Sequence, residues 1–159
     1  MSRSLAVYKE MCISQGIEFT EDKKSVTVCG KISAGKYSVR GDVSSQFISG
    51  LMFALPLLGS DSIIDITGAL ESGSYLGMTV KALADFGVRI SRTDEHTIFI
   101  KGNQSYKPRT LCVEGDYSNA AFLEAFNTVD GNVAVTGLKK DTCQGDAVYR
   151  KLFGKLVRG

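Results

Sequence analysis

The sequence GDVSSQFISGLMFALPLL, residues 41–58, is the most informative stretch of the chain. A glycine-aspartate turn precedes two serines and a glutamine, and an apolar run from Phe47 to Leu58 follows. Small hydroxyl residues are common where helices begin, because their oxygens accept hydrogen bonds from the free N–H groups of the first turn. The stretch therefore predicts a turn and then a buried helix, whose positive end is suited to binding a phosphate.

The polar residues of this turn allow two interpretations. In one, Ser44 or Asp42 only caps the helix that follows. In the other, the residues bind an anion, because two consecutive serines and the amide of Gln46 offer more hydrogen-bonding groups than a cap needs.

The elements around this helix follow an order that is repeated. A helix-like segment at 5–15 ends at a glycine and precedes a predicted hairpin with strands at 17–20 and 26–29. A second helix-like segment, at 75–86, also ends at a glycine and precedes strand-like runs at 88–91 and 98–101. The sequence RGDVS at 40–44 returns as EGDYS at 114–118, so that the landmarks recur at a spacing of roughly 70 residues, which indicates a structural repeat.

The repeated unit reads strand, helix, strand, helix, strand, strand. One complete unit covers about 36–102, beginning with a strand at 37–39. It lies between the last half of one unit (3–30) and the first two thirds of another (109–158), which begins with a predicted strand at 111–113. We therefore predict an α/β (α+β) fold built of such units, and we interpret the chain as a piece of a longer protein.

The composition excludes several other classes of protein. The chain has 159 residues, 43% hydrophobic and 23% charged, with 19 Lys and Arg against 17 Asp and Glu, a balance typical of a globular protein. Its cations form no basic block, so we expect no nucleic-acid partner. Ser49, Gly50 and Pro56 interrupt the longest apolar run, and no signal peptide is visible, so we expect a cytoplasmic protein with no membrane partner.

Cysteine and histidine offer little for metal binding. The four cysteines (Cys12, Cys29, Cys112 and Cys143) are widely spaced, contain no CxxC pair, and are expected to be buried reduced thiols. His96 is the only histidine, and we expect it to be exposed in a hairpin turn. A histidine-based triad or a zinc site is therefore not predicted.

The stretch at 41–57 closely resembles the signature of the 5-enolpyruvylshikimate-3-phosphate synthase family. ESGSY at 71–75 stands where that family has its Ser-x-x-Tyr element, and VEGDYS at 113–118 and QGD at 144–146 extend the resemblance almost to the C-terminus. It implies a fold of the enolpyruvyl transferase (inside-out α/β barrel) type, with two lobes and an active site between them.

The resemblance implies that the boundary between the two lobes falls at the EGD sequence of this chain. Residues 1–113 would form part of the shikimate-phosphate-binding lobe, and 114–159 would begin the second lobe. The implied activity transfers the enolpyruvyl group of phosphoenolpyruvate to the 5-hydroxyl of shikimate 3-phosphate, a step of the shikimate pathway toward chorismate and the aromatic amino acids. Both compounds are then partners of the protein, and no cofactor or metal is implied.

The resemblance also assigns roles by motif position. Ser44, Ser45 and Ser72 would hold shikimate 3-phosphate, largely through its phosphate. Gln46 would lie between that ligand and phosphoenolpyruvate, and Tyr75 would line the same pocket. The alternatives are that Ser72 only caps a helix and that Tyr75 only packs.

Arg3 matches the arginine of the family's Arg-Pro element, which binds phosphoenolpyruvate. A guanidinium suits that role because it can donate two hydrogen bonds to one carboxylate or phosphate. Here Ser4 replaces the proline, and the alternative is a solvated surface arginine.

The family's remaining catalytic groups have no counterpart in this sequence. They are an N-terminal Lys-Ser with its downstream arginine, a second-lobe aspartate, a Lys-Glu-x-x-Arg segment, a His-Arg pair and a late lysine. We therefore expect the chain alone to be inactive. The alternatives are a UDP-N-acetylglucosamine enolpyruvyl transferase, which shares the unit but is disfavoured by the Ser-Ser-Gln-Phe and Ser-x-x-Tyr elements, and a non-catalytic anion-binding module.

The two incomplete units are complementary, because each supplies elements that the other lacks. The second has apolar helix faces at Ala121, Phe122, Ala125 and Phe126 and at Val148, Leu152 and Leu156. Left in water, such faces favour association. The piece would either fold back on the N-terminal half-unit or be exchanged between two chains as a swapped dimer. The oligomeric state stays open.

Overall fold

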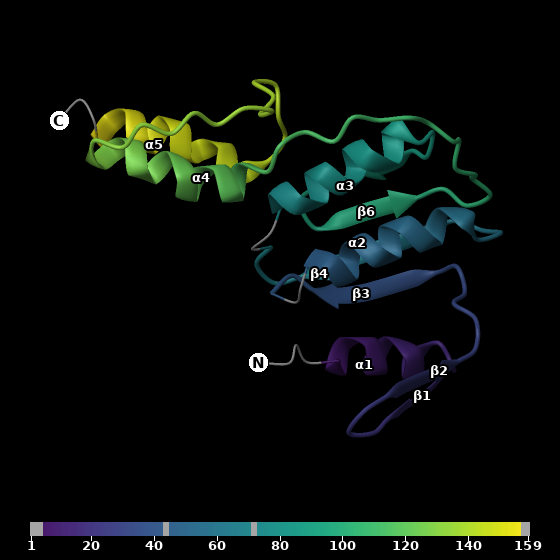
Figure 1. Ribbon diagram of the computed structural model, residues 1–159. Coiled ribbons are helices and arrows are strands. Elements are labelled where there is room, and N and C mark those ends of the chain that lie inside the picture. Colours follow the sequence, from purple (N-terminus) through teal and green to yellow (C-terminus); the bar gives the residue numbers. More distant parts are fainter. Residues whose placement is uncertain (1–4, 43–44, 71–72, 157–159) are drawn as a thin grey trace. The chain divides into compact units, whose positions relative to one another are not determined.

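The computed structural model describes residues 5–42, 45–70 and 73–156. The chain forms two compact units, Met1–Lys107 and Pro108–Gly159, and each is described here by itself (Figure 1). The first unit contains all the described strands, and the described residues of the second contain helices but no strand. The chain is therefore a mixed α/β protein.

A four-stranded mixed sheet forms the centre of the first unit. Its strand order is β3 (Lys36–Arg40), β4 (Ser62–Thr67), β6 (Thr97–Ile100) and β5 (Ile90–Arg92). β3 and β4 run parallel, with Lys36 opposite Ile63 and Arg40 opposite Thr67. β6 is antiparallel to both of its neighbours. The parallel pair requires a crossover connection, and a helix supplies it.

Two helices pack on this sheet. α2 (Ser45–Ala54) continues into a short 3₁₀ helix, η1 (Leu55–Leu57), and connects β3 to β4. α3 (Gly73–Asp85) connects β4 to the β5–β6 hairpin. Alternate strand residues pack against both helices, as the period of two in a strand requires. The resulting core contains Tyr37, Val39, Phe47, Ile48, Leu51, Met52, Leu55, Ile64, Ile66, Leu76, Leu83, Val88, Ile98 and Ile100.

The order β3, α2, β4, α3, β5, β6 is the strand, helix, strand, helix, strand, strand order expected for about 36–102. The predicted apolar helix begins at Ser45 and ends at Ala54, where η1 with its Pro56 takes over. The predicted glycine stop after the second helix is also present, since Gly87 has φ +83° and follows α3 closely.

The N-terminal elements are a helix and a separate hairpin. α1 (Ala6–Ser14) ends before Gly16, which has φ +66°, a left-handed conformation that glycine adopts without strain. β1 (Glu18–Glu21) and β2 (Val26–Cys29) pair antiparallel, as the sequence predicts. Val7 and Met11 of α1 pack against the core of the first unit. The helix is thereby attached to that unit by apolar contacts.

The second unit is a small helical cluster. α4 (Tyr117–Ala125) is followed by η2 (Phe126–Val129), and η3 (Gly145–Val148) leads into α5 (Tyr149–Leu156). The Asp116 side chain caps α4 by accepting a hydrogen bond from the backbone N–H of Ser118 at 2.8 Å. The core of this unit is small. Among the described residues 108–156, its buried members are Tyr117, Ala120 and Tyr149.

Two predictions about this chain are wrong. Residues 111–113 are not a strand, and Val113 is 89% exposed, because a strand needs a paired neighbour and none of the described residues pairs with this segment. Only Cys12 is a buried thiol; Cys29, Cys112 and Cys143 are free but exposed. Apolar neighbours in sequence do not by themselves bury a cysteine in a short hairpin or a loop.

His96 is exposed in the turn between β5 and β6, as expected. The carboxylate of Asp94 shapes that turn by accepting hydrogen bonds from the backbone N–H groups of His96 and Thr97, each at 2.7 Å. Across the described ranges, none of the helices has the length and apolar character needed to cross a bilayer.

Candidate functional site

The candidate site lies where the two parallel strands of the sheet end. β3 ends at Arg40 and α2 begins at Ser45, while β4 ends at Thr67 and α3 begins at Gly73. Helices that follow adjacent parallel strands begin at the same end of those strands, the carboxyl end. Ligands of α/β proteins commonly bind there, just outside the carboxyl ends of the strands.

Gly41 brings the two strand ends together. Its backbone N–H donates a hydrogen bond to the carbonyl of Thr67 at 2.8 Å. A Cβ at position 41 would lie 2.5 Å from the carbonyl oxygen of Ala69, closer than real Cβ contacts allow. Only glycine therefore permits the two turns to approach this closely.

A pocket of about 290 Å³ lies between α2 and α3. Three of the predicted site residues line it: Ser45 and Gln46 at the start of α2, and Tyr75 in the first turn of α3. The Tyr75 side chain is 47% exposed, so it is open to a ligand rather than enclosed in the core. The rest of the lining consists of Ser49, Phe53, Met78, Thr79 and Ala82.

The other predicted site residues, Arg3, Ser44 and Ser72, lie outside the described residues. Ser44 directly precedes α2, and Ser72 directly precedes α3.

The charges around the pocket suit an anion. The first turns of α2 (45–48) and α3 (73–76) contain no acidic residue, so no carboxylate within them offsets the positive ends of the helix dipoles. The nearby Asp42 is paired with Arg40, whose Nε lies 3.0 Å from Oδ1 and whose Nη2 bonds Oδ2. This hydrogen bonding holds the pKa of Asp42 below its ordinary value and raises the pKa of Arg40. The one carboxylate in this turn is therefore ionised but already neutralised by a cation.

Two pocket residues were missed by the sequence analysis. Ser49 and Thr79 lie in the pocket, and their hydroxyl oxygens are 2.8 Å apart. A signal was available in the sequence, because Ser49 lies four residues after Ser45, and Thr79 lies four residues after Tyr75. Residues at this spacing share one face of a helix.

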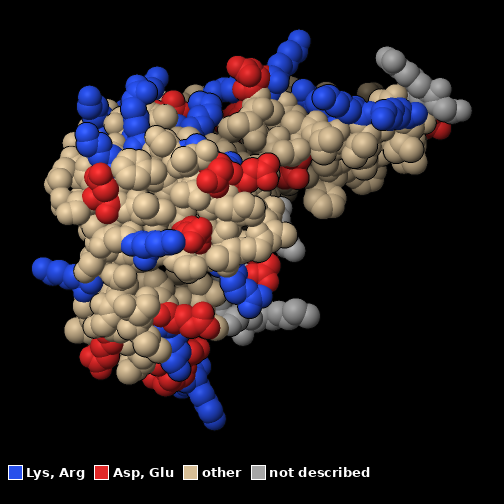
Figure 2. Space-filling model, turned by 180° about the vertical axis from the view of Figure 1, so that it is seen from behind, with Lys and Arg blue, Asp and Glu red and all other residues tan. Residues whose placement is uncertain are grey.

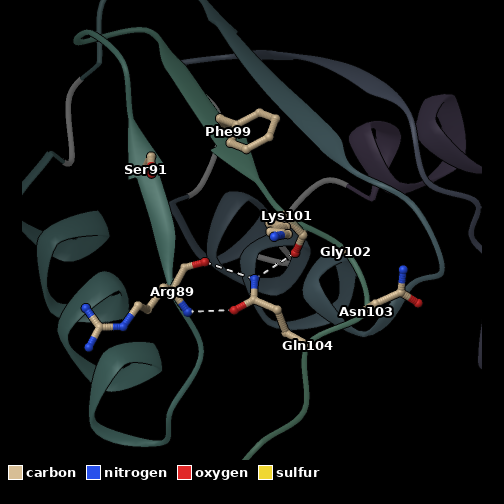
Figure 3. Close-up of a pocket in the computed structure, with 7 residues that line it drawn as sticks. All are labelled: Arg89, Ser91, Phe99, Lys101, Gly102, Asn103 and Gln104. Atoms are coloured by element: carbon tan, nitrogen blue, oxygen red, sulfur yellow. Dashed lines mark hydrogen bonds between the residues drawn. The ribbon is translucent and has the colours of Figure 1, made fainter.

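A second pocket, of about 450 Å³, lies beside β5 and β6 (Figure 3). The side-chain amide of Gln104 donates hydrogen bonds to the carbonyls of Arg89 (2.9 Å) and Lys101 (2.6 Å) and accepts one from the N–H of Arg89 (2.8 Å). Figure 3 shows the Arg89 guanidinium turned away from Gln104. The amide thus fixes the backbone here, and the cationic side chains do not converge on a ligand.

The surface charge is mixed. On the face shown in Figure 2, basic and acidic side chains are interspersed among uncharged ones. Within the described part of the chain, no group of three or more His, Cys, Asp and Glu side chains is arranged to hold a metal ion.

Comparisons with known proteins agree on one family. Residues 1–156 match the family model described as EPSP synthase (3-phosphoshikimate 1-carboxyvinyltransferase). The chain is 43% identical over 150 residues to a 3-phosphoshikimate 1-carboxyvinyltransferase of Clostridium kluyveri, a match that covers 93% of this chain and 35% of that protein.

Two further relatives bear the same name. The protein of Clostridioides difficile is 39% identical over 156 residues (97% of this chain, 36% of the relative), and that of Brachyspira hyodysenteriae is 41% identical over 145 residues (91% and 34%). The chain thus spans about a third of the length of the curated relatives that it matches.

Proposed function

Because this chain belongs to the EPSP synthase (3-phosphoshikimate 1-carboxyvinyltransferase) family, we propose that it supplies the shikimate 3-phosphate site of an enolpyruvyl transferase. The reaction moves the enolpyruvyl group of phosphoenolpyruvate to the 5-hydroxyl of shikimate 3-phosphate and releases phosphate. One observation carries the proposal: a single pocket between α2 and α3 brings together Ser45, Gln46 and Tyr75.

The pocket suits a phosphorylated sugar-like acid for physical reasons. Two helices begin beside it, and the free N–H groups of a helix start bind phosphate oxygens well. The hydroxyl of Ser45 and the amide of Gln46 can each donate a hydrogen bond to an anion. Phe53, Met78 and Ala82 supply apolar walls for the carbon ring. The proposed set of substrate-binding residues is completed by Arg3, Ser44 and Ser72. Of these, Arg3 would bind phosphoenolpyruvate.

We also propose that the chain is organised as two lobes, 1–113 and 114–159, built of the repeated unit of the enolpyruvyl transferase barrel. Two similar turns, whose acceptors differ by one position in the repeat, support it. The N–H of Gly41 donates to the carbonyl of Thr67 in the first unit, and the N–H of Gly115 donates to the carbonyl of Gly137 at 2.9 Å in the second. Gly68, which follows Thr67, and Gly137 itself both have positive φ, +75° and +84°.

Of the alternatives, a UDP-N-acetylglucosamine enolpyruvyl transferase is not favoured, because both the family match and the named relatives are 3-phosphoshikimate 1-carboxyvinyltransferases. The other alternative, a non-catalytic anion-binding module, matches what we expect of this chain when it is isolated, namely binding without turnover. The acid-base groups that the reaction needs have no counterpart in its sequence.

The test is calorimetric titration of the chain with shikimate 3-phosphate, with shikimate and inorganic phosphate as separate controls, beside a phosphate-release assay with phosphoenolpyruvate. We expect weak binding of shikimate 3-phosphate in preference to either control, without turnover. Equal binding of all three compounds would contradict the proposed site, and sustained phosphate release would contradict the expected inactivity.

A further inference from the structure

Two hydroxyl groups meet inside the contact between α2 and α3. Ser49 Oγ and Thr79 Oγ1 are 2.8 Å apart, and Thr79 is only 8% exposed. Three of the other side chains that line the pocket with them, Phe53, Met78 and Ala82, are apolar. Burying a hydroxyl among such neighbours costs free energy unless it is hydrogen-bonded, so a pair of hydroxyls at this contact calls for a physical reason.

The direction of the hydrogen bonds follows from the number of protons. Thr79 Oγ1 lies 3.0 Å from the carbonyl oxygen of Tyr75, which can only accept. A hydroxyl has one proton, so Thr79 donates it to Tyr75, and Ser49 must donate its own proton to Thr79. The result is a directed chain that runs from α2 through Thr79 to the backbone of Tyr75.

The two hydrogen-bonded hydroxyls lie one helical turn from proposed substrate-binding residues on both helices. Ser49 follows Ser45 by four residues, and Thr79 follows Tyr75 by four, so each hydroxyl shares a helix face with a pocket residue. All four residues line the same pocket. The bridge therefore joins the two halves of the site.

We propose that the Ser49–Thr79 bridge is a positioning element that fixes the spacing of α2 and α3, and through it the affinity for shikimate 3-phosphate. The inference rests on the proposed function. The hydrophobic effect has no direction, whereas a hydrogen bond between two short side chains forms only over a narrow range of distances and angles. Ser49 and Thr79 act on Ser45 and Tyr75, and no contact of their own with substrate is required.

The substitution that tests the bridge is Thr79→Val, which keeps the shape of the side chain and removes both of its hydrogen bonds. We expect the dissociation constant of shikimate 3-phosphate to rise about tenfold, because a small displacement of positioning groups weakens every contact made across the two helices. Thr79→Ser keeps the hydroxyl and should restore an affinity close to that of the unchanged chain. The double variant Ser49→Ala, Thr79→Val should bind no worse than Thr79→Val alone, since one bridge is lost in both.

Ser62→Ala is the matched control for loss of stability. Ser62 also has a buried hydroxyl, which accepts a hydrogen bond from the N–H of Gly35 at 3.2 Å. It lies at the start of β4, whereas the site lies beyond the other end of that strand. It should lower the melting temperature and leave the dissociation constant unchanged. All affinities are measured at a temperature at which circular dichroism shows each variant folded.

The outcomes separate the two proposals. If the unchanged chain binds and Thr79→Val binds equally well, even with a lower melting temperature, the bridge only stabilises the fold and the positioning role is overturned. Failure of Thr79→Ser to restore affinity overturns it as well. If the unchanged chain shows no preference for shikimate 3-phosphate, the proposed function itself fails, and the positioning role fails with it.

Discussion

The ring of Tyr8 meets the ring of Phe47 edge-on, with the centroids 4.9 Å apart and the planes at 90°. This contact attaches α1 to the start of α2, one residue after Gln46 of the candidate site. Edge-to-face pairs of aromatic rings are favourable because the positive edge of one ring faces the negative face of the other.

Removing this contact should loosen α1. For Tyr8→Ala we expect the free energy of unfolding to fall by about 1 to 2 kcal/mol, since both the ring pair and part of the apolar contact are lost. Tyr8→Phe keeps the ring and is the control. Urea unfolding followed by circular dichroism measures both variants, and equal losses in the two would mean that the hydroxyl rather than the ring matters.

Ser45→Ala should weaken ligand binding more than folding. Losing one donor to a charged phosphate should cost about 1.5 to 3 kcal/mol of binding free energy in a dry site. The melting temperature should change less, because the preceding Ser44 is still available to cap α2. Titration with shikimate 3-phosphate and a thermal melt of the same sample test this. A lower melting temperature with unaltered affinity would show that Ser45 is structural only.

Gly41→Ala should be strongly destabilising. Its Cβ would lie 2.5 Å from the carbonyl oxygen of Ala69, and the clash is with backbone that cannot turn away. We expect a loss of more than about 2 kcal/mol in the free energy of unfolding.

Gly50→Ala is the matched control for Gly41→Ala. A Cβ at Gly50 meets nothing within 4 Å, and the residue lies inside α2. Alanine there should raise the free energy of unfolding by about 0.5 to 1 kcal/mol, because it favours the helix over the unfolded chain. Chemical denaturation of the pair should give shifts of opposite sign, and two shifts of the same sign would contradict the assigned close approach at Gly41.

Asp42 should titrate below its ordinary range. Arg40 donates hydrogen bonds to its carboxylate and lowers its pKa. A lowered pKa in the folded chain means that this pair contributes stability above the pKa of the unfolded state and loses it as the pH falls through the folded value. Both side chains are well exposed, so the contribution is small. In an NMR titration of the Asp42 carboxyl carbon, Arg40→Gln should move the midpoint upward, and an unmoved midpoint would refute the pairing in solution.

The second unit should self-associate through its helices. Phe122 is 75% exposed on α4, and Leu156 is 69% exposed on α5, with Phe126 and Leu152 also open to solvent. We expect the sedimentation coefficient to increase with protein concentration and Phe122→Ser to reduce that increase. Lys151→Ser, an exposed polar position on α5, is the control and should have no effect. A chain that stays monomeric at all concentrations would contradict both association and exchange of segments.

The sequence was most informative where a local signal marks an element. Gly16 and Gly87 ended two helices at the predicted places, because left-handed backbone there favours glycine. The prediction of a strand at 111–113 was wrong because a strand forms only when it pairs with another strand, which a local sequence pattern cannot reveal.

The candidate site was predictable in part for the same reason. Ser45, Gln46 and Tyr75 stood out through their motifs, whereas Ser49 and Thr79 lie inside helices whose other residues are mainly apolar. Their importance depends on a contact between two helices that are separate in sequence.

The order of the strands also bears on aggregation. β3 is an edge of the four-stranded sheet, and exposed edges can recruit strands from other molecules. Here α1 lines a groove together with β3, so a helix flanks that edge, and Lys36 and Arg40 place a cation at each end of the strand (Figure 1). The opposite edge, β5, is only three residues long. The four-stranded sheet is thus protected against extension by further strands, so we expect association of copies to use other surfaces, such as the exposed apolar residues of α4 and α5.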